Sequence, residues 1–121
     1  MRKQTKTSLT RKLDKICSEI IRKNPCARCG EAQHNKLQCA HIFSRVYRNV
    51  RWDLLNLISL CTSCHFWAHR NPVLFTELIQ NHLYREWNYS KLKRRMQKSK
   101  KWTLLEMREL YESLKKVRDG E

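Results

Sequence analysis

Three histidines are the residues of this sequence best suited to chemistry. His65 and His69 lie four positions apart in a segment whose pattern predicts a helix, so one face of that helix can present both imidazoles to one divalent ion. His41 lies in a predicted strand that leads towards the same helix. A neutral imidazole titrates close to neutral pH and can therefore take a proton from water. Together the three side chains predict metal-assisted hydrolysis with His41 as the general base.

Four of the six cysteines form two C-x-x-C pairs, Cys26 with Cys29 and Cys61 with Cys64. Two such pairs supply the four thiolates that bind a structural Zn²⁺ tetrahedrally. Gly30 follows the first pair and allows the chain to turn back after it. We therefore expect a four-cysteine zinc site that ties the N-terminal half of the chain to the helix that carries His65.

Two other uses of these ligands remain open. Cys26 and Cys29 could join His65 and His69 in a mixed finger, although the interval between the two halves is much longer than in such fingers. The cysteine pairs could also be separate buried thiols or redox motifs. A redox C-x-x-C usually sits alone at the head of a βαβ unit, and the sequence predicts no such unit.

A formal net charge of +15 over 121 residues favours a polyanionic partner. Nucleic acid is the first candidate and an anionic membrane surface the second, while a charged surface that serves solubility is the plainest interpretation. Residues 91–101 contain seven basic side chains and no acidic one, and residues 1–25 contain eight basic and two acidic ones. The sequence has neither a signal peptide nor an apolar run of about 18 residues, so we expect a cytoplasmic protein that does not act on membranes.

The elements that position these residues are predicted to form one α+β, mainly helical domain over residues 1–121. We expect an N-terminal helix over 7–23, a zinc-stapled core over 24–70 and a helical C-terminal region over 71–121. The first helix should stop before Asn24-Pro25 because a residue that precedes proline disfavours the helical conformation.

Within the core, the apolar pattern predicts a β-hairpin followed by a helix. The expected elements are strands over Leu37–Phe43 and Leu57–Leu60, joined by a long loop over 44–56, and a helix over Thr62–Arg70. This arrangement brings His41 close to the helix that carries the other two histidines.

The C-terminal region contains three further helix signals. Asn71 followed by Pro72 predicts a helix start, Ser90 could cap the next helix, and Thr103 with Glu106 forms a capping-box pattern for the last one. The last helix carries an apolar stripe that we expect in the core rather than against a cofactor; it consists of Met107, Leu110, Tyr111 and Leu114.

The order His41-x14-Asn56-x8-His65-x3-His69, interleaved with the two cysteine pairs, resembles the signature of HNH endonucleases, also called ββα-metal or His-Me finger nucleases. The stretches 37–41, 44–45 and 51–53 are most similar to small phage recombination nucleases of the NinG/Rap type. The resemblance covers roughly residues 8 to 80. It implies a ββα-metal core and a metal-dependent DNA endonuclease or nickase that acts in recombination, processing or packaging, in the host-cell cytoplasm if the protein is phage-encoded. The products would carry 5′-phosphate and 3′-hydroxyl ends.

The resemblance also implies roles for single residues. His41 would be the general base, and Asn56 would hold the connecting loop and orient the His41 region through hydrogen bonds. His65 and His69 would ligate a catalytic Mg²⁺, Mn²⁺ or Ni²⁺, and the four cysteines would hold zinc. One departure is Ala40, where many HNH enzymes carry an aspartate or histidine ligand. The metal would then be coordinated by two histidines together with water and phosphate oxygens, or by a further ligand from elsewhere.

Of the four remaining cysteines and histidines, Cys39, His34 and His82 are expected to be structural, and Cys17 is left without a partner in the cysteine pairs. Cys39 should share a strand face with His41 and belong to the core rather than ligate the metal. His34 and His82 lie outside every motif described above.

Basic side chains near the predicted site are candidate DNA contacts. The loop over 44–52 contains Arg45, Arg48 and Arg51, interleaved with Tyr47 and Trp52; arginine can bind phosphate in a fork, and aromatic rings can stack on bases. Lys93, Arg94 and Arg95 of the 91–101 run would form a second contact with the DNA backbone.

The expected partner is duplex or branched DNA, bound by a monomer or a homodimer. Two other functions remain open. The chain could be a non-catalytic, zinc-stabilised DNA-binding accessory protein, which Ala40 favours, or an RNA-binding zinc-ribbon protein.

Overall fold

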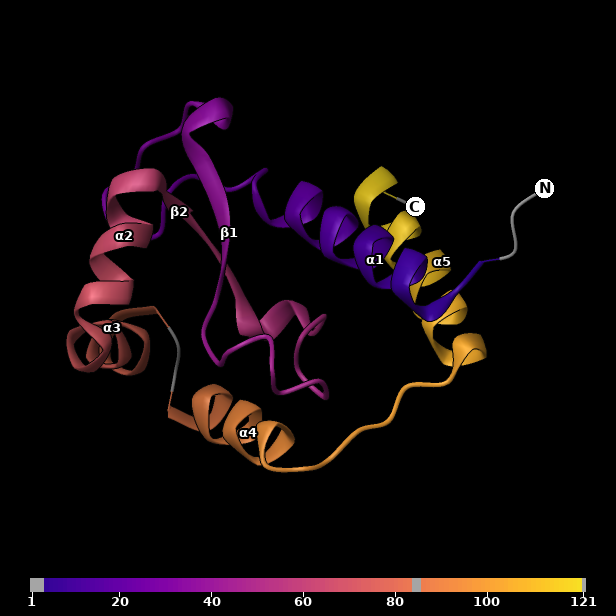
Figure 1. Ribbon diagram of the computed structural model, residues 1–121. Coiled ribbons are helices and arrows are strands. Elements are labelled where there is room, and N and C mark those ends of the chain that lie inside the picture. The colour runs from indigo at the N-terminus through magenta and orange to yellow at the C-terminus, as the bar shows by residue number, and fades with distance from the viewer. Residues whose placement is uncertain (1–3, 84–85, 121) are drawn as a thin grey trace.

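Two long helices from the two halves of the chain lie side by side, and the first of them packs against a short β-hairpin (Figure 1). The structure is a computed structural model, and it describes residues 4–83 and 86–120. The two helices are α1 (Lys6–Ile21) and α5 (Leu104–Asp119). Arg108 near the start of α5 bonds to Gln4, and Arg118 near its end pairs with Glu19 of α1 at 3.1 Å, so the two helices run parallel.

The hairpin consists of β1 (Leu37–His41) and β2 (Leu57–Cys61), which pair in antiparallel register from Leu37 opposite Cys61 to His41 opposite Leu57. Short 3₁₀ turns precede the strands at η1 (His34–Lys36) and η2 (Leu54–Asn56). β1 is shorter than the expected Leu37–Phe43. The pairing ends because the backbone N–H of Phe43 donates to the Asn56 side chain instead of to β2.

Helix α2 (Thr62–Arg70) follows β2 directly and has the bounds that the sequence predicts. The chain continues through α3 (Pro72–Leu78), the π-helical turn η3 (Ile79–Leu83) and α4 (Glu86–Met96). The helix start predicted at Asn71 and Pro72 is confirmed, although the Asn71 side chain makes no capping hydrogen bond and its amide donates instead to the carbonyl of Trp67 in α2. Ser90 lies inside α4 and therefore does not cap it. The capping box of Thr103 and Glu106 is confirmed.

Two clusters of buried side chains form the interior. The first joins α1, α5 and the loop before β2, with Leu9, Leu13, Ile16, Trp52, Met107 and Leu114 among its buried members. Leu110 and Tyr111 pack against this cluster, so the predicted core role of the C-terminal stripe is confirmed. The second cluster joins the hairpin, α2 and η3, with Leu37, Ile58, Leu60, Ala68 and Ile79 among its buried members.

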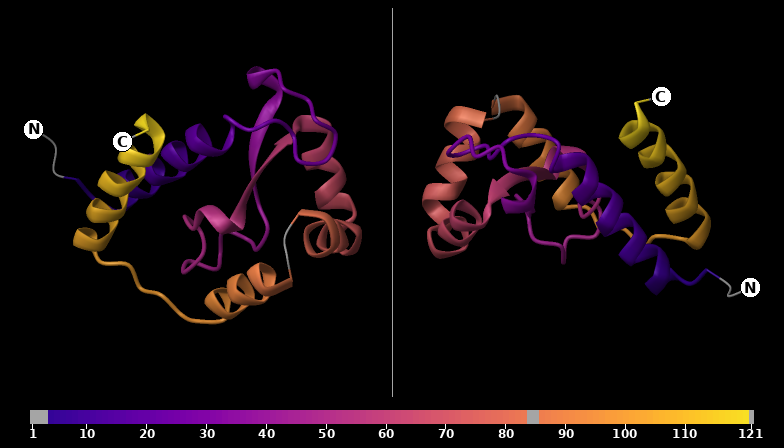
Figure 2. Two further views of the ribbon diagram at one scale, coloured as in Figure 1. Left: turned by 180° about the vertical axis from the view of Figure 1, so that it is seen from behind. Right: turned by 90° about the horizontal axis from the view of Figure 1, so that it is seen from above.

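The hairpin therefore lies between two helical layers, with α1 and α5 on one side and α2 and α3 on the other (Figure 2). Both α1 and α2 contact both strands. The predicted α+β, mainly helical fold with a small hairpin is confirmed. Over the described ranges, 4–83 and 86–120, no helix is long and apolar enough to cross a membrane.

Candidate active site and metal centre

The four paired cysteines meet at one point, where the start of α2 faces the turn after α1. The Sγ atoms of Cys26, Cys29, Cys61 and Cys64 all lie within 4.8 Å of one another, and those of Cys29 and Cys61 are 3.6 Å apart. Four sulfurs about 2.3 Å from one tetrahedral Zn²⁺ would be separated by about 3.8 Å. The cluster fits a structural zinc ion, and it consists of the four expected cysteines without the histidines of a mixed finger.

Local backbone geometry builds this cluster from the two pairs. Gly30 has φ +82°, which side-chain-bearing residues rarely adopt, and its N–H donates to the carbonyl of Cys26 at 2.9 Å. The second pair is fixed by helix capping, because the Cys61 sulfur accepts from the N–H of Cys64 at 3.4 Å.

Arg28 lies against the cysteine cluster, and the sequence did not predict this role. Its guanidinium stacks over the Trp67 ring at 3.7 Å, and its Nη1 lies 3.5 Å from the Cys64 sulfur. Four thiolates around a divalent ion leave a net negative charge, which a neighbouring guanidinium compensates. Only the position of Arg28 inside the first C-x-x-C pair could have indicated this role.

The second candidate metal site lies further along α2. The Nε2 atoms of His65 and His69 are 3.2 Å apart. Two imidazole nitrogens at about 2.0–2.1 Å from one ion lie about 2.8–3.4 Å apart when the angle between them is octahedral or tetrahedral. The pair therefore fits two ligands of a single ion.

Gln38 of β1 orients this pair and was not predicted from the sequence. Its side-chain oxygen lies 2.7 Å from His65 Nδ1. An amide oxygen only accepts, so Nδ1 carries the proton and the lone pair of Nε2 remains for a metal. Burial, and to a smaller extent the charge of His69, lowers the pKa of His65 below its ordinary value, which favours the neutral ligand form.

One pocket of about 620 Å³ is lined by His41, His65 and His69 together with Arg45. The neighbouring Ala40 is 2 % exposed and offers no ligand. Among the described residues that line this pocket there is no carboxylate. The protein would therefore hold an ion here through two histidines, which leaves coordination positions for water and substrate oxygens.

His41 lies at the end of β1 and is partly buried. Burial lowers its pKa, and the positive charge of Arg45 lowers it further, while the backbone of Arg51 and the carboxylate of Asp14 act in the opposite direction. The net result is a pKa below the ordinary value, so the ring is neutral at pH 7 and can accept a proton.

Asn56 is fully buried and joins the two ends of the loop that follows His41. Its Oδ1 accepts from the N–H of Phe43 at 2.7 Å, and its Nδ2 donates to the carbonyls of Phe43 and Val50 at 2.9 and 3.1 Å. These bonds hold the chain just after His41 against the start of β2, which restricts where the imidazole can lie.

Of the basic side chains predicted to contact DNA, some are exposed and others are held in ion pairs within the protein. Arg45, Arg48, Lys93 and Arg94 are exposed. Arg51, by contrast, binds Asp14 of α1 through two hydrogen bonds of 2.7 and 3.1 Å, and Arg95 pairs with Asp53 at 2.6 Å. Asp14 also accepts from the Trp52 indole at 2.7 Å. The hydrogen bonds from Arg51 and Trp52 outweigh the effect of burial and lower the pKa of Asp14.

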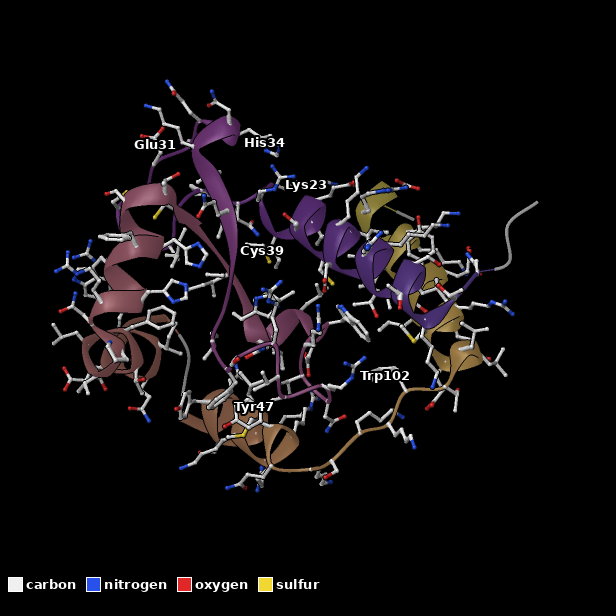
Figure 3. The ribbon with its side chains drawn as sticks, in the orientation of Figure 1. Lys23, Glu31, His34, Cys39, Tyr47 and Trp102 are labelled. Atoms are coloured by element: carbon white, nitrogen blue, oxygen red, sulfur yellow. The ribbon has the colours of Figure 1, made fainter. Side chains whose placement is uncertain are left out.

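Of the remaining residues of metal-binding type, Cys39 also lines the histidine pocket. Cys39, labelled in Figure 3, packs against the first cluster, to which Cys17 belongs, and burial raises the pKa of Cys39 to about 11 and that of Cys17 to about 12. Both are therefore protonated at pH 7. His34 is exposed and lies against the carbonyl of Arg22. The side chain of His82 lies outside the described residues.

Comparisons of the chain with protein-family models, curated proteins and solved structures find no match. Any functional assignment therefore depends on the chemistry of the described side chains and on the order of the motif residues along the chain.

Proposed function

We propose that this chain is a metal-dependent endonuclease or nickase of the HNH type that hydrolyses phosphodiester bonds in DNA during recombination, processing or packaging. The proposal is carried by the single pocket lined by His41, His65 and His69, in which two imidazole nitrogens 3.2 Å apart face one another. The net charge of +15 supports a polyanionic substrate. The order of these histidines around a buried asparagine supports the HNH assignment.

In this proposal each residue of the pocket has a separate role in hydrolysis. The neutral imidazole of His41 takes the proton from the attacking water. His65 and His69 would hold a divalent cation, which when bound supplies charge stabilisation at the phosphate and at the departing 3′ oxygen. Arg45 lines the same pocket and is exposed, so its guanidinium can hold a phosphate oxygen of the substrate.

The direct test is cleavage of supercoiled plasmid DNA by zinc-loaded protein with added Mg²⁺, Mn²⁺ or Ni²⁺, or with no added ion. We expect nicked or linear product only with an added ion. His69→Ala should reduce the rate by about 10²-fold or more, because one of two protein ligands is lost. His69 is exposed, so zinc content and thermal stability should be unchanged. Cleavage at an equal rate by the variant would contradict the assignment of the metal site.

The pH dependence of cleavage provides a second prediction. Cleavage needs His41 deprotonated, and its pKa lies below 6.5, so the rate of the wild type should fall only when the pH drops below that value. Arg45→Gln removes one of the three causes of the lowered pKa, which are burial, the charge of Arg45 and the charge of Arg51. The midpoint of the acid limb should therefore move up towards 6.5, whatever happens to the maximal rate. Rates at saturating metal across pH 5 to 8 measure this midpoint, and an unchanged midpoint would show that Arg45 does not act on the base.

A second candidate function is a zinc-stabilised DNA-binding accessory protein without nuclease activity. It is favoured by Ala40 and by the lack of a carboxylate among the described residues of the pocket. This alternative predicts DNA binding by folded, zinc-loaded protein and no cleavage of duplex or branched DNA with any of the three added ions.

A further inference from the structure

Two basic segments that are far apart in the sequence form one surface. The loop after β1 is fastened to the end of α4 by Asn49, whose amide donates to the carbonyl of Arg95 at 2.7 Å. The ion pair of Arg95 with Asp53 makes a second connection. The indole of Trp102 makes a third, because it donates to the carbonyl of Arg48 at 2.9 Å. Arg95 and Trp102 thus hold the loop against the segment after α4.

A pocket of about 500 Å³ lies where these segments meet, and we call it the Tyr47 pocket. It is lined by Val46, Tyr47 and Arg48 of the loop, by the last residue of α4 and by residues 97–100 that follow it. Tyr47 is 43 % exposed and Val46 is 77 % exposed. Figure 3 shows Tyr47 beside the end of α4. The pocket therefore presents an aromatic ring and an apolar side chain to solvent.

The charge around this ring is positive. Arg48, Lys98 and Lys100 line the pocket, and no acidic residue does so among the described ones. Lys100 is paired with Glu106. Arg48 and Lys98 are exposed, and in the part of the chain that the structure describes neither takes part in an ion pair. Two cations therefore remain for an anionic ligand next to an exposed ring.

We propose that the Tyr47 pocket binds an unpaired nucleotide of the DNA substrate. The ring of Tyr47 stacks on the base, and Arg48 and Lys98 contact the phosphates on either side of it. In an intact duplex the bases are stacked on one another, so Tyr47 cannot stack on them. The duplex backbone could still contact Arg48 and Lys98. A single-stranded segment can contact both the Tyr47 ring and the two cations.

This inference rests on the proposed nuclease and specifies its substrate further. Arg45 lines the histidine pocket and Tyr47 lines the second pocket, and two residues of extended chain span at most about 7 Å. The unpaired nucleotide would therefore lie within a few nucleotides of the scissile phosphate. The preferred substrate is a duplex with a single-stranded segment beside the cut.

The test measures binding of the full, zinc-loaded chain to labelled oligo(dT), to a duplex of equal length and to oligo(rU), with no added divalent ion. Tyr47→Leu should weaken binding of oligo(dT) by about 10-fold, which is the usual size of a lost stacking contact, and leave duplex binding unchanged. Tyr47→Phe keeps the ring and should bind like the wild type. Arg48→Gln should weaken binding of both DNA forms because both have phosphates.

The stacking assignment would be overturned if Tyr47→Leu lost equal affinity for the duplex and for oligo(dT), or if it lost no affinity for oligo(dT). Tighter binding of oligo(rU) than of oligo(dT) would overturn the assignment of DNA as the ligand. Because no cleavage is measured, these results are independent of the plasmid assay. The binding test can therefore succeed when plasmid cleavage is absent, and it can fail when cleavage is present.

Discussion

Cys29→Ser is expected to abolish the cooperative thermal unfolding of the zinc-loaded protein, although Cys29 is exposed. Loss of an exposed side chain without a partner normally changes stability by about 0.5 kcal/mol or less. Binding of a structural zinc ion contributes on the order of 10 kcal/mol, which is comparable with the whole folding free energy of a small domain. Removing one of four thiolates should therefore leave residues 24–70 largely unfolded. Thermal melts followed by circular dichroism, with zinc content measured in parallel, check this result.

Cys39→Ala is the matched control for this experiment. Cys39 is a half-buried thiol outside the four-cysteine cluster, so its loss should cost about 1 kcal/mol and leave zinc content unchanged. Addition of a strong chelator to the wild type should reproduce the effect of Cys29→Ser. If Cys29→Ser melts like Cys39→Ala, the cluster is not a zinc site that the fold depends on.

His41→Ala should reduce the rate of plasmid cleavage by about 10²–10⁴-fold at pH 7, because the attacking water loses its base. The four sulfurs of the cysteine cluster lie outside the histidine pocket and keep their surroundings, so zinc content and thermal stability should change little. Binding of uncleaved DNA should also persist, since arginine and lysine side chains would make the proposed phosphate contacts.

His34→Ala provides the control, because His34 is exposed and lies away from the histidine pocket. It should cleave like the wild type. Full activity of His41→Ala would show that another group activates the water, and loss of DNA binding together with cleavage would show that His41 acts through substrate binding. Cleavage that rises with pH in the variant, as hydroxide replaces the base, would support the assigned role.

The sequence predicted those helices whose ends are marked by capping residues or by proline. The bounds of α2 follow from the Cys61 position and the Asn71-Pro72 pair, and the capping box at Thr103 is complete within four residues. The cysteine cluster could be predicted because its two pairs have the spacing that zinc requires. In each case the information lies within a few residues and does not depend on distant neighbours.

The parts that could not be predicted depend on partners that only the fold brings together. Arg51 was expected at the DNA, but the packing of α1 places Asp14 beside it and occupies its guanidinium. Gln38 has no recognisable motif, and its role follows only from the distance of β1 from His65. Ser90 has the side chain of a helix cap, yet α4 already begins at Glu86, so a good capping residue is used inside a helix.

The parallel pairing of α1 and α5 determines the order in which the chain can assemble during its synthesis. The cysteine cluster is complete once Cys64 has been made, whereas Leu9 and Leu13 wait for Met107 and Leu114. About 50 residues separate Cys64 from Leu114, which corresponds to several seconds at typical rates of translation. During that interval part of the apolar stripe of α1 has no cover. We therefore expect the half of the chain that carries the cysteine cluster to fold first, with α1 against the hairpin, and the last helix to be made to complete the cover of α1.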